Sequence, residues 1–114
     1  MKTLNRSAAI VRPKAPYVEW ANGLEDGGPT MDLEDQRRKP AVFLLPAVVY
    51  DSDFQRLLAE HFQAMFEFQL WTWMTDEACW PTNRTLEVFT EWFDVEFQSM
   101  PVDLDSSSIT GDEL

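Results

Sequence analysis

Residues 40–46 read PAVFLLP, and residues 52–74 read SDFQRLLAEHFQAMFEFQLWTWM; these two neighbouring segments decide the fold. The first places five apolar residues between two prolines, a length typical of a strand rather than a helix. A continuous apolar run without polar alternation favours burial on both faces. We therefore predict a central strand over residues 41–45.

The second segment combines a helix start signal with a helical repeat. Ser52, with Gln55 three residues later, matches the capping-box pattern. Apolar residues then recur every three or four positions, at Phe54, Leu57, Leu58, Phe62, Met65, Phe66 and Leu70, which predicts a helix from residue 53 to about residue 74. Beyond Phe62 the aromatic residues occupy nearly the whole circumference, so either both sides pack inside the fold or one side is an interface.

Upstream of these segments, three shorter elements can be assigned from local signals. Residues 7–12 resemble a strand that Pro13 ends, and residues 16–22 a short helix that the Asn22-Gly23 pair ends. Two glycines and a proline predict a mobile loop over residues 25–29. A helical turn capped by Thr30 or Asp32 and reaching Arg38 has acidic residues early and basic residues late, as the helix dipole favours.

Downstream, Thr82 or Asn83 can cap a third helix that ends near Asp94. Residues 95–104 alternate between apolar and polar, with a slip of phase around residues 98–99. A strand with a bulge explains the slip, and a helix prolonged through Phe97 is the competing interpretation.

These elements follow the order strand, helix, short helix, strand, helix, helix, strand. The order predicts an α+β (or small α/β) fold with about three strands and helices packed on the sheet. A chain of 114 residues holds one domain, which we assign to residues 1–104. Residues 105–114 are acidic and serine-rich, and we expect a flexible tail.

Charge is distributed unevenly along the chain. The net charge is −11; residues 1–40 contain seven basic and six acidic groups, whereas residues 41–114 contain two and fourteen. An acidic protein lacks the lysines and arginines that displace counterions from phosphate backbones, so we expect no nucleic-acid partner. A content of 45% hydrophobic residues is typical of a folded rather than a disordered chain. No apolar run reaches the roughly 18 residues of a membrane span, so we expect no membrane partner.

A reducing compartment suits this chain. Its single cysteine, Cys79, cannot form an internal disulfide. The apolar run near the N-terminus extends only from Ala8 to Val11, which is shorter than the apolar core of a secretory signal. We therefore expect a cytoplasmic location.

Several segments resemble a family of small uncharacterised bacterial proteins that have no assigned activity. They are LNRSAAIVRPK (residues 4–14), residues 17–20, WPTNRT (residues 80–85) and WFD (residues 92–94). The resemblance implies a bacterial cytosolic origin and no mechanism.

The aromatic surplus suggests a non-enzymatic interaction or self-associating module, whose partner is a second copy or a basic protein. The candidate surface comprises Phe66, Phe68, Trp71, Trp73, Trp80 and Arg84. Since basic charge at a helix start opposes the dipole, we expect Arg84 to pair with an acidic residue, Asp76, Glu77 or Glu87.

The alternative is a small enzyme that uses Asp76, Glu77, His61 and Arg84 in a cleft. A dyad of Cys79 and His61 is less favoured, because nearby acids raise a thiol pKa. The chain has no HExxH, CxxC or glycine-rich phosphate-binding motif, so we assign no catalytic residue, no metal and no cofactor.

Overall fold

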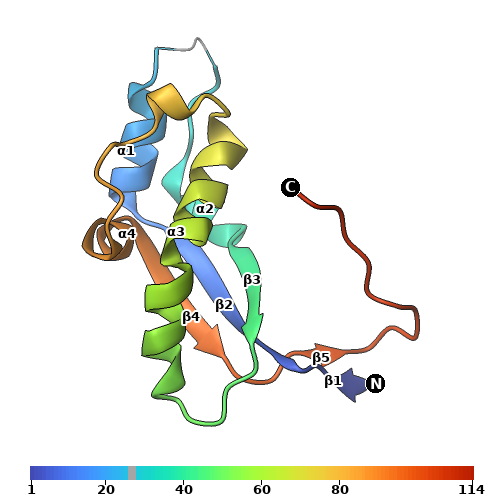
Figure 1. The fold of residues 1–114 in the computed structure, drawn as a ribbon. Coiled ribbons are helices and arrows are strands. Elements are labelled where there is room, and N and C mark those ends of the chain that lie inside the picture. Colours follow the sequence, from blue (N-terminus) through green and yellow to red (C-terminus); the bar gives the residue numbers. More distant parts are fainter. Residues whose placement is uncertain (26–27) are drawn as a thin grey trace.

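The computed structural model describes residues 1–25 and 28–114 and has a mixed α+β fold (Figure 1). In these residues the elements follow the order β1 (Lys2–Thr3), β2 (Arg6–Pro13), α1 (Ala15–Gly23), α2 (Leu33–Arg38), β3 (Ala41–Pro46), α3 (Asp53–Trp73), the 3-10 helix η1 (Glu77–Cys79), α4 (Leu86–Trp92), β4 (Phe93–Gln98) and β5 (Val102–Asp103). The α+β prediction is confirmed. The loop expected at residues 25–29 includes residues 26–27, which lie outside the described residues.

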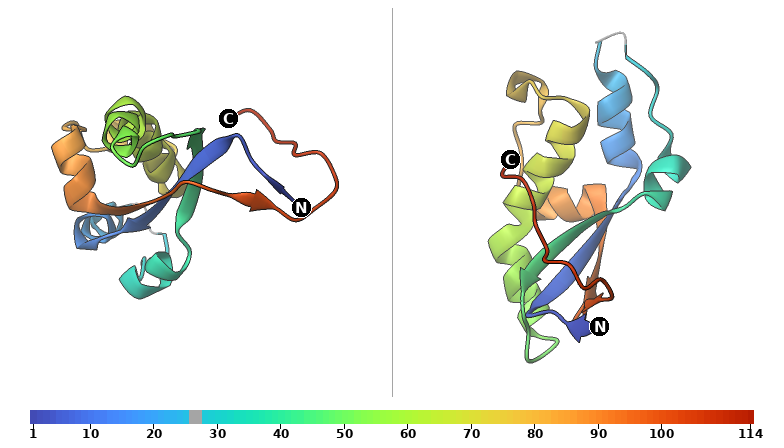
Figure 2. Two further views of the ribbon diagram at one scale, coloured as in Figure 1. Left: turned by 90° about the horizontal axis from the view of Figure 1, so that it is seen from below. Right: turned by 90° about the vertical axis from the view of Figure 1, so that its right-hand side faces the viewer.

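The main sheet has three antiparallel strands in the order β3-β2-β4. Ala9 of β2 lies opposite Phe43 on one side and Phe97 on the other, and Val11 lies opposite Val95. These residues share one sheet face because side chains alternate along a strand. That face packs against α3, whereas α2 lies on the opposite side of the sheet (Figure 2).

The prediction of β3 as a central strand is wrong. β2 is central, and β3 is an edge strand, since it pairs with β2 alone among the described strands. Leu45 faces the core at 3% exposure, but Val42 and Leu44 are 61% and 50% exposed on the outer face. An uninterrupted apolar run therefore marks a strand that is covered on only one face.

The C-terminal segment forms two strands rather than one bulged strand. β4 begins directly after α4, so the competing helix through Phe97 is also wrong. The slip of phase at residues 98–99 marks the end of β4, after which β5 pairs with β1, with Lys2 opposite Asp103. Residues 105–114 follow as an exposed extended segment.

Helix α3 begins where the sequence predicts, but with a different cap. Ser52 makes no side-chain capping bond; instead, the carboxylate of Asp53 accepts hydrogen bonds from the backbone N–H groups of Val49 and Tyr50. For α4 the cap is Thr85, whose hydroxyl accepts from the Val88 N–H at 3.2 Å, rather than residue 82 or 83. Asp32 caps α2 as predicted.

The core contains a cluster of aromatic rings between α3, α4 and β4. Phe66 of α3 is fully buried, with ring centroids of Phe89, Trp92 and Phe93 between 5.5 and 5.7 Å away. The aromatic circumference of α3 is thus largely explained by the sheet, α1 and α4, which cover different sides of one helix (Figure 1). Within the part of the chain that the structure describes, no helix is both long and apolar enough to cross a membrane.

Helix α1 is joined to α3 by a buried hydrogen bond. The Tyr17 hydroxyl donates to the backbone carbonyl of Gln69 at 2.5 Å, and the Tyr17 side chain is 2% exposed. Burial raises the pKa of Tyr17 from 10.0 to about 12, an effect that a hydrogen bond with Thr72 partly opposes. The neutral phenol is therefore the form that the folded state stabilises.

This burial predicts a pH dependence of stability. Since the pKa is higher in the folded protein, the contribution of Tyr17 is fully present below pH 10 and is lost as the pH rises from about 10 to about 12. We expect Tyr17→Phe to lower the free energy of unfolding by about 1–2 kcal/mol at pH 7, through loss of the hydrogen bond. The gap between Tyr17→Phe and wild type, measured by urea unfolding, should narrow above pH 10; a constant gap would contradict the assignment.

Candidate functional site

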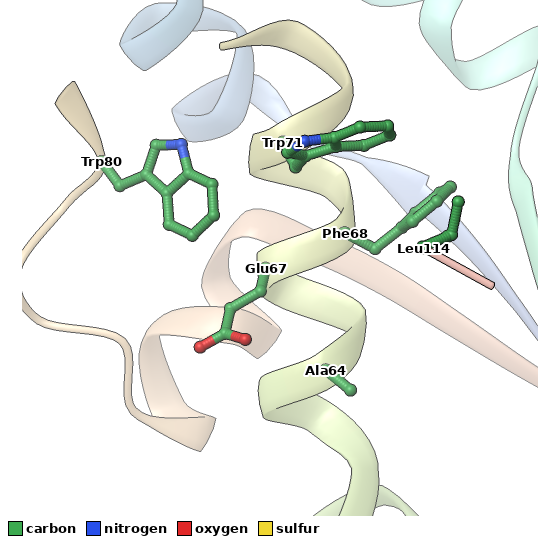
Figure 3. Close-up of a pocket in the computed structure, with 6 residues that line it drawn as sticks. All are labelled: Ala64, Glu67, Phe68, Trp71, Trp80 and Leu114. Atoms are coloured by element: carbon green, nitrogen blue, oxygen red, sulfur yellow. The ribbon is translucent and has the colours of Figure 1, made fainter. Parts of the chain in front are cut away.

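The main surface feature is an apolar groove on the outer side of α3. A first cavity, of about 370 Å³, is lined by Ala64, Glu67, Phe68, Trp71, Trp80 and Leu114 (Figure 3). Five of these six residues are apolar or aromatic, and Glu67 supplies the one charge. Figure 3 shows Trp80 and Glu67 on one side of the helix and Phe68, Ala64 and Leu114 on the other. The cavity thus wraps over the exposed face of α3.

A second cavity continues the groove between α3 and the edge strand. Its volume is about 280 Å³, and its lining residues are Phe43, Leu44, Leu45, His61, Ala64, Met65, Phe68 and Leu114. Ala64, Phe68 and Leu114 belong to both cavities. We refer to the two cavities together as the α3–β3 groove.

Aromatic contacts hold the groove in shape. The rings of Phe43 and Phe68 meet edge to face at a centroid distance of 5.5 Å, which joins β3 to α3. Phe68 in turn contacts Trp71 at 6.3 Å, and Trp71 remains 46% exposed. Edge-to-face ring pairs are stabilising beyond their buried area, so the floor of the groove is preformed.

The six residues of the predicted interaction surface occupy different environments. Phe68, Trp71 and Trp80 line the groove together. Phe66 does not: it is fully buried in the core, so its place on the candidate surface is wrong. Trp73 is half-buried against the core and lines neither cavity.

Arg84 also lies outside the groove. Its guanidinium carbon sits 5.8 Å from the centre of the Trp80 ring, and one Nη donates to the Pro81 carbonyl at 2.8 Å. The expected pairing with Asp76, Glu77 or Glu87 is wrong, because no ion pair between described residues includes Arg84. Arg84 instead packs on Trp80 as a cation on an aromatic face.

The β3 side of the groove is not predicted by the sequence pattern. Phe43 and Leu44 line the groove from β3, and Ala64 lines it from α3. The apolar run of the strand predicts a central position in the sheet, and the alanine has no distinguishing feature. One signal was present: Ala64 follows His61 by three residues and precedes Phe68 by four. Such spacing places the three side chains on one helix face.

The residues of the enzyme alternative are not brought together in either cavity of the groove, nor in a third cavity lined by Leu4, Asn5, Arg6, Leu44 and Ile109. His61 lines the second cavity, whereas none of the three contains Asp76, Glu77 or Arg84. The Asp76 carboxylate caps η1 by accepting from the Ala78 N–H at 3.0 Å. Over residues 1–25 and 28–114, no group of three His, Cys, Asp or Glu side chains is placed to hold a metal ion.

Charge is concentrated away from the groove. Asp94 of β4 pairs with Arg37 at 2.9 Å and with Lys14 at 3.8 Å, and Arg12 pairs with Glu96 at 3.6 Å. Three basic groups of the first third of the chain, Arg12, Lys14 and Arg37, thus meet acids of β4. The groove is left with an apolar floor and one acidic residue.

Comparison with known proteins assigns this chain to no family. No family model, curated protein or solved structure matches the chain. The resemblance to small bacterial proteins stays a prediction.

Proposed function

We propose that this protein is a non-enzymatic protein–protein interaction module and that the α3–β3 groove is its contact surface. The observation that carries the proposal is Trp71, a large aromatic side chain 46% exposed beside Phe68 at the mouth of an apolar cavity. Tryptophan is enriched among the residues that dominate binding energy at protein interfaces. Exposed apolar side chains that gather at one place, rather than singly, are typical of interaction sites.

The surroundings of the groove support a protein partner rather than a small polar substrate. Glu67 has the single charged side chain of the first cavity, and no Asp, Glu, Lys or Arg side chain lines the second. A substrate site needs convergent polar groups to orient the reacting atoms. An apolar floor with a polar rim is instead the usual composition of a protein interface.

The acidic exterior suits such a module. A net charge of −11 keeps the chain soluble despite the exposed groove, and it attracts basic partners over long range. We propose a cytoplasmic setting for this activity, since the single cysteine cannot form an internal disulfide, and a bacterial one on the resemblance to small bacterial proteins.

Site-specific photo-crosslinking tests the contact surface. A benzophenone amino acid is introduced in place of Trp71, and in a second variant in place of Gln55, an exposed residue on the opposite side of α3. We expect discrete protein adducts from position 71, several times more abundant than from position 55 and reduced by an excess of unlabelled wild-type protein. Equal yields at the two positions would contradict the proposed surface.

A further inference from the structure

The free edge of β3 is unprotected against pairing. Native edge strands are usually guarded by charged side chains, prolines or bulges. The other edge, β4, carries Asp94 and Glu96, but β3 reads AVFLLP, with no charge and a proline only at its end. Its backbone groups on the side away from β2 pair with no described strand.

The face of α3 beside this edge carries a seam suited to another helix. His61, Ala64, Phe68 and Trp71 are spaced by three, four and three residues, the spacing of a helix–helix contact. All four line the α3–β3 groove. We call these four residues the α3 seam.

We propose that the occupant of the groove is a second copy of this chain, bound through antiparallel β3–β3 pairing. This inference rests on the proposed function and names its partner. A two-fold axis perpendicular to the sheet joins the two three-stranded sheets into one of six strands and keeps both α3 helices on the same face. The two seams then meet in antiparallel orientation.

The seam is self-complementary under this symmetry. Phe68 packs on Phe43 near the middle of β3, so the axis passes close to the segment between Ala64 and Phe68. An antiparallel contact about that point sets the small Ala64 of one copy against the large Phe68 of the other. Alternation of small and large side chains is what close helix packing requires.

Charge at the two ends of β3 fixes the direction of pairing. Arg38 and Lys39 precede the strand, and Asp51 and Asp53 follow it. Lys39 pairs with Asp35 and Asp53 with Arg56, so the exposed Arg38 and Asp51 are the charges left without an ion pair among the described residues. Antiparallel pairing places the basic end of one copy beside the acidic end of the other, whereas parallel pairing would place like charges together. An interface of about 800 Å² per partner would take roughly a tenth of the 7726 Å² surface of the chain.

The chain's own tail is a competing occupant. Leu114 lines both cavities and Ile109 lines a third cavity with Leu44 of β3, but these two tail residues are 90% and 62% exposed and leave the seam largely uncovered. The tail is therefore displaced when the second copy binds.

Measuring the molecular mass of the wild type and of two matched variants, each with glutamate in place of an exposed alanine of α3, tests the inference. We expect sedimentation velocity of the full chain to give twice 13.2 kDa in a concentration-dependent manner. Ala64→Glu places like charges at the two-fold axis and should weaken the dimer at least about tenfold. Ala59→Glu, also at an exposed alanine of α3 but outside the groove, should leave the dimer intact, as should Leu114→Ser.

Other outcomes would overturn the second-copy inference. One is a monomer at all concentrations up to about 1 mM, and another is an equal effect of the two glutamate variants on the dimer. A third is loss of the dimer in Leu114→Ser, which would assign the groove to the tail of the other copy. If the wild type is monomeric but position 71 still forms adducts with other proteins, the proposed function stands and the second-copy inference falls. If position 71 forms no adducts either, both fall.

Salt provides an independent measurement. Two chains of net charge −11 repel each other over long range, and this repulsion exceeds the attraction between the few exposed charges at the ends of β3, so raising the salt concentration should tighten the dimer. A complex with a basic partner should weaken under the same change. Weakening of the self-associated form by salt would contradict an apolar β3–β3 and α3–α3 contact.

Discussion

Replacement of Phe66 with alanine is expected to lower the free energy of unfolding by about 3–5 kcal/mol. The ring is fully buried and contacts three other aromatic rings, from Phe89, Trp92 and Phe93. Its removal loses the transfer free energy of the ring and leaves a cavity that the surrounding rings cannot fill without moving. Domains of this size are stable by only about 5–15 kcal/mol, so the variant should unfold roughly 10–20 °C below the wild type.

A second substitution on the same helix separates core from surface. Trp71→Ala removes a larger side chain, but one that is 46% exposed, so we expect a loss below about 1 kcal/mol in the monomer. Urea unfolding followed by far-UV circular dichroism measures both variants on one scale. A loss at position 71 equal to that at position 66 would mean that the exposed side of α3 is buried in solution.

The contrast between buried and exposed aromatic residues of α3 shows which features local sequence signals cannot predict. Period and capping signals are local, so they placed β2, α1, α2 and the ends of α3 within one or two residues. Phe66 and Phe68 are both aromatic and two residues apart, so composition alone gave no means of separating the core ring from the groove ring. Their separation depends on where α4 packs, which is a tertiary contact.

Strand order is beyond local signals for the same reason. An apolar run such as residues 41–45 indicates burial, but its place in the sheet depends on pairing with β2, whose partner residues lie 30 to 38 positions earlier in the chain. The β1–β5 pair joins residues 2–3 to residues 102–103, each too short to show a period. The candidate interaction surface accordingly included Phe68, Trp71 and Trp80 of the groove and none of its residues on β3.

Trp80→Ala is the other substitution for which we expect a large effect, a loss of about 3–5 kcal/mol. Trp80 is 9% exposed, and its Nε1–H donates to the carbonyl of Met74 at 2.7 Å. It thus ties the connector after α3 back to the end of that helix. The connector also contacts α1, because Trp20 Nε1–H donates to the Cys79 carbonyl at 3.0 Å.

A graded series identifies which part of Trp80 matters. Trp80→Phe keeps an aromatic ring beneath the Arg84 guanidinium but removes the Nε1–H donor and so leaves the Met74 carbonyl without that partner. We expect this variant to lose about 1–2 kcal/mol, less than the loss in Trp80→Ala. Equal losses would assign the whole effect to the hydrogen bond and would contradict the role of the ring as a packed wall of the groove. Because that wall also borders Glu67 and Trp71 in the first cavity, crosslinking from position 71 should persist in Trp80→Phe and decline in Trp80→Ala.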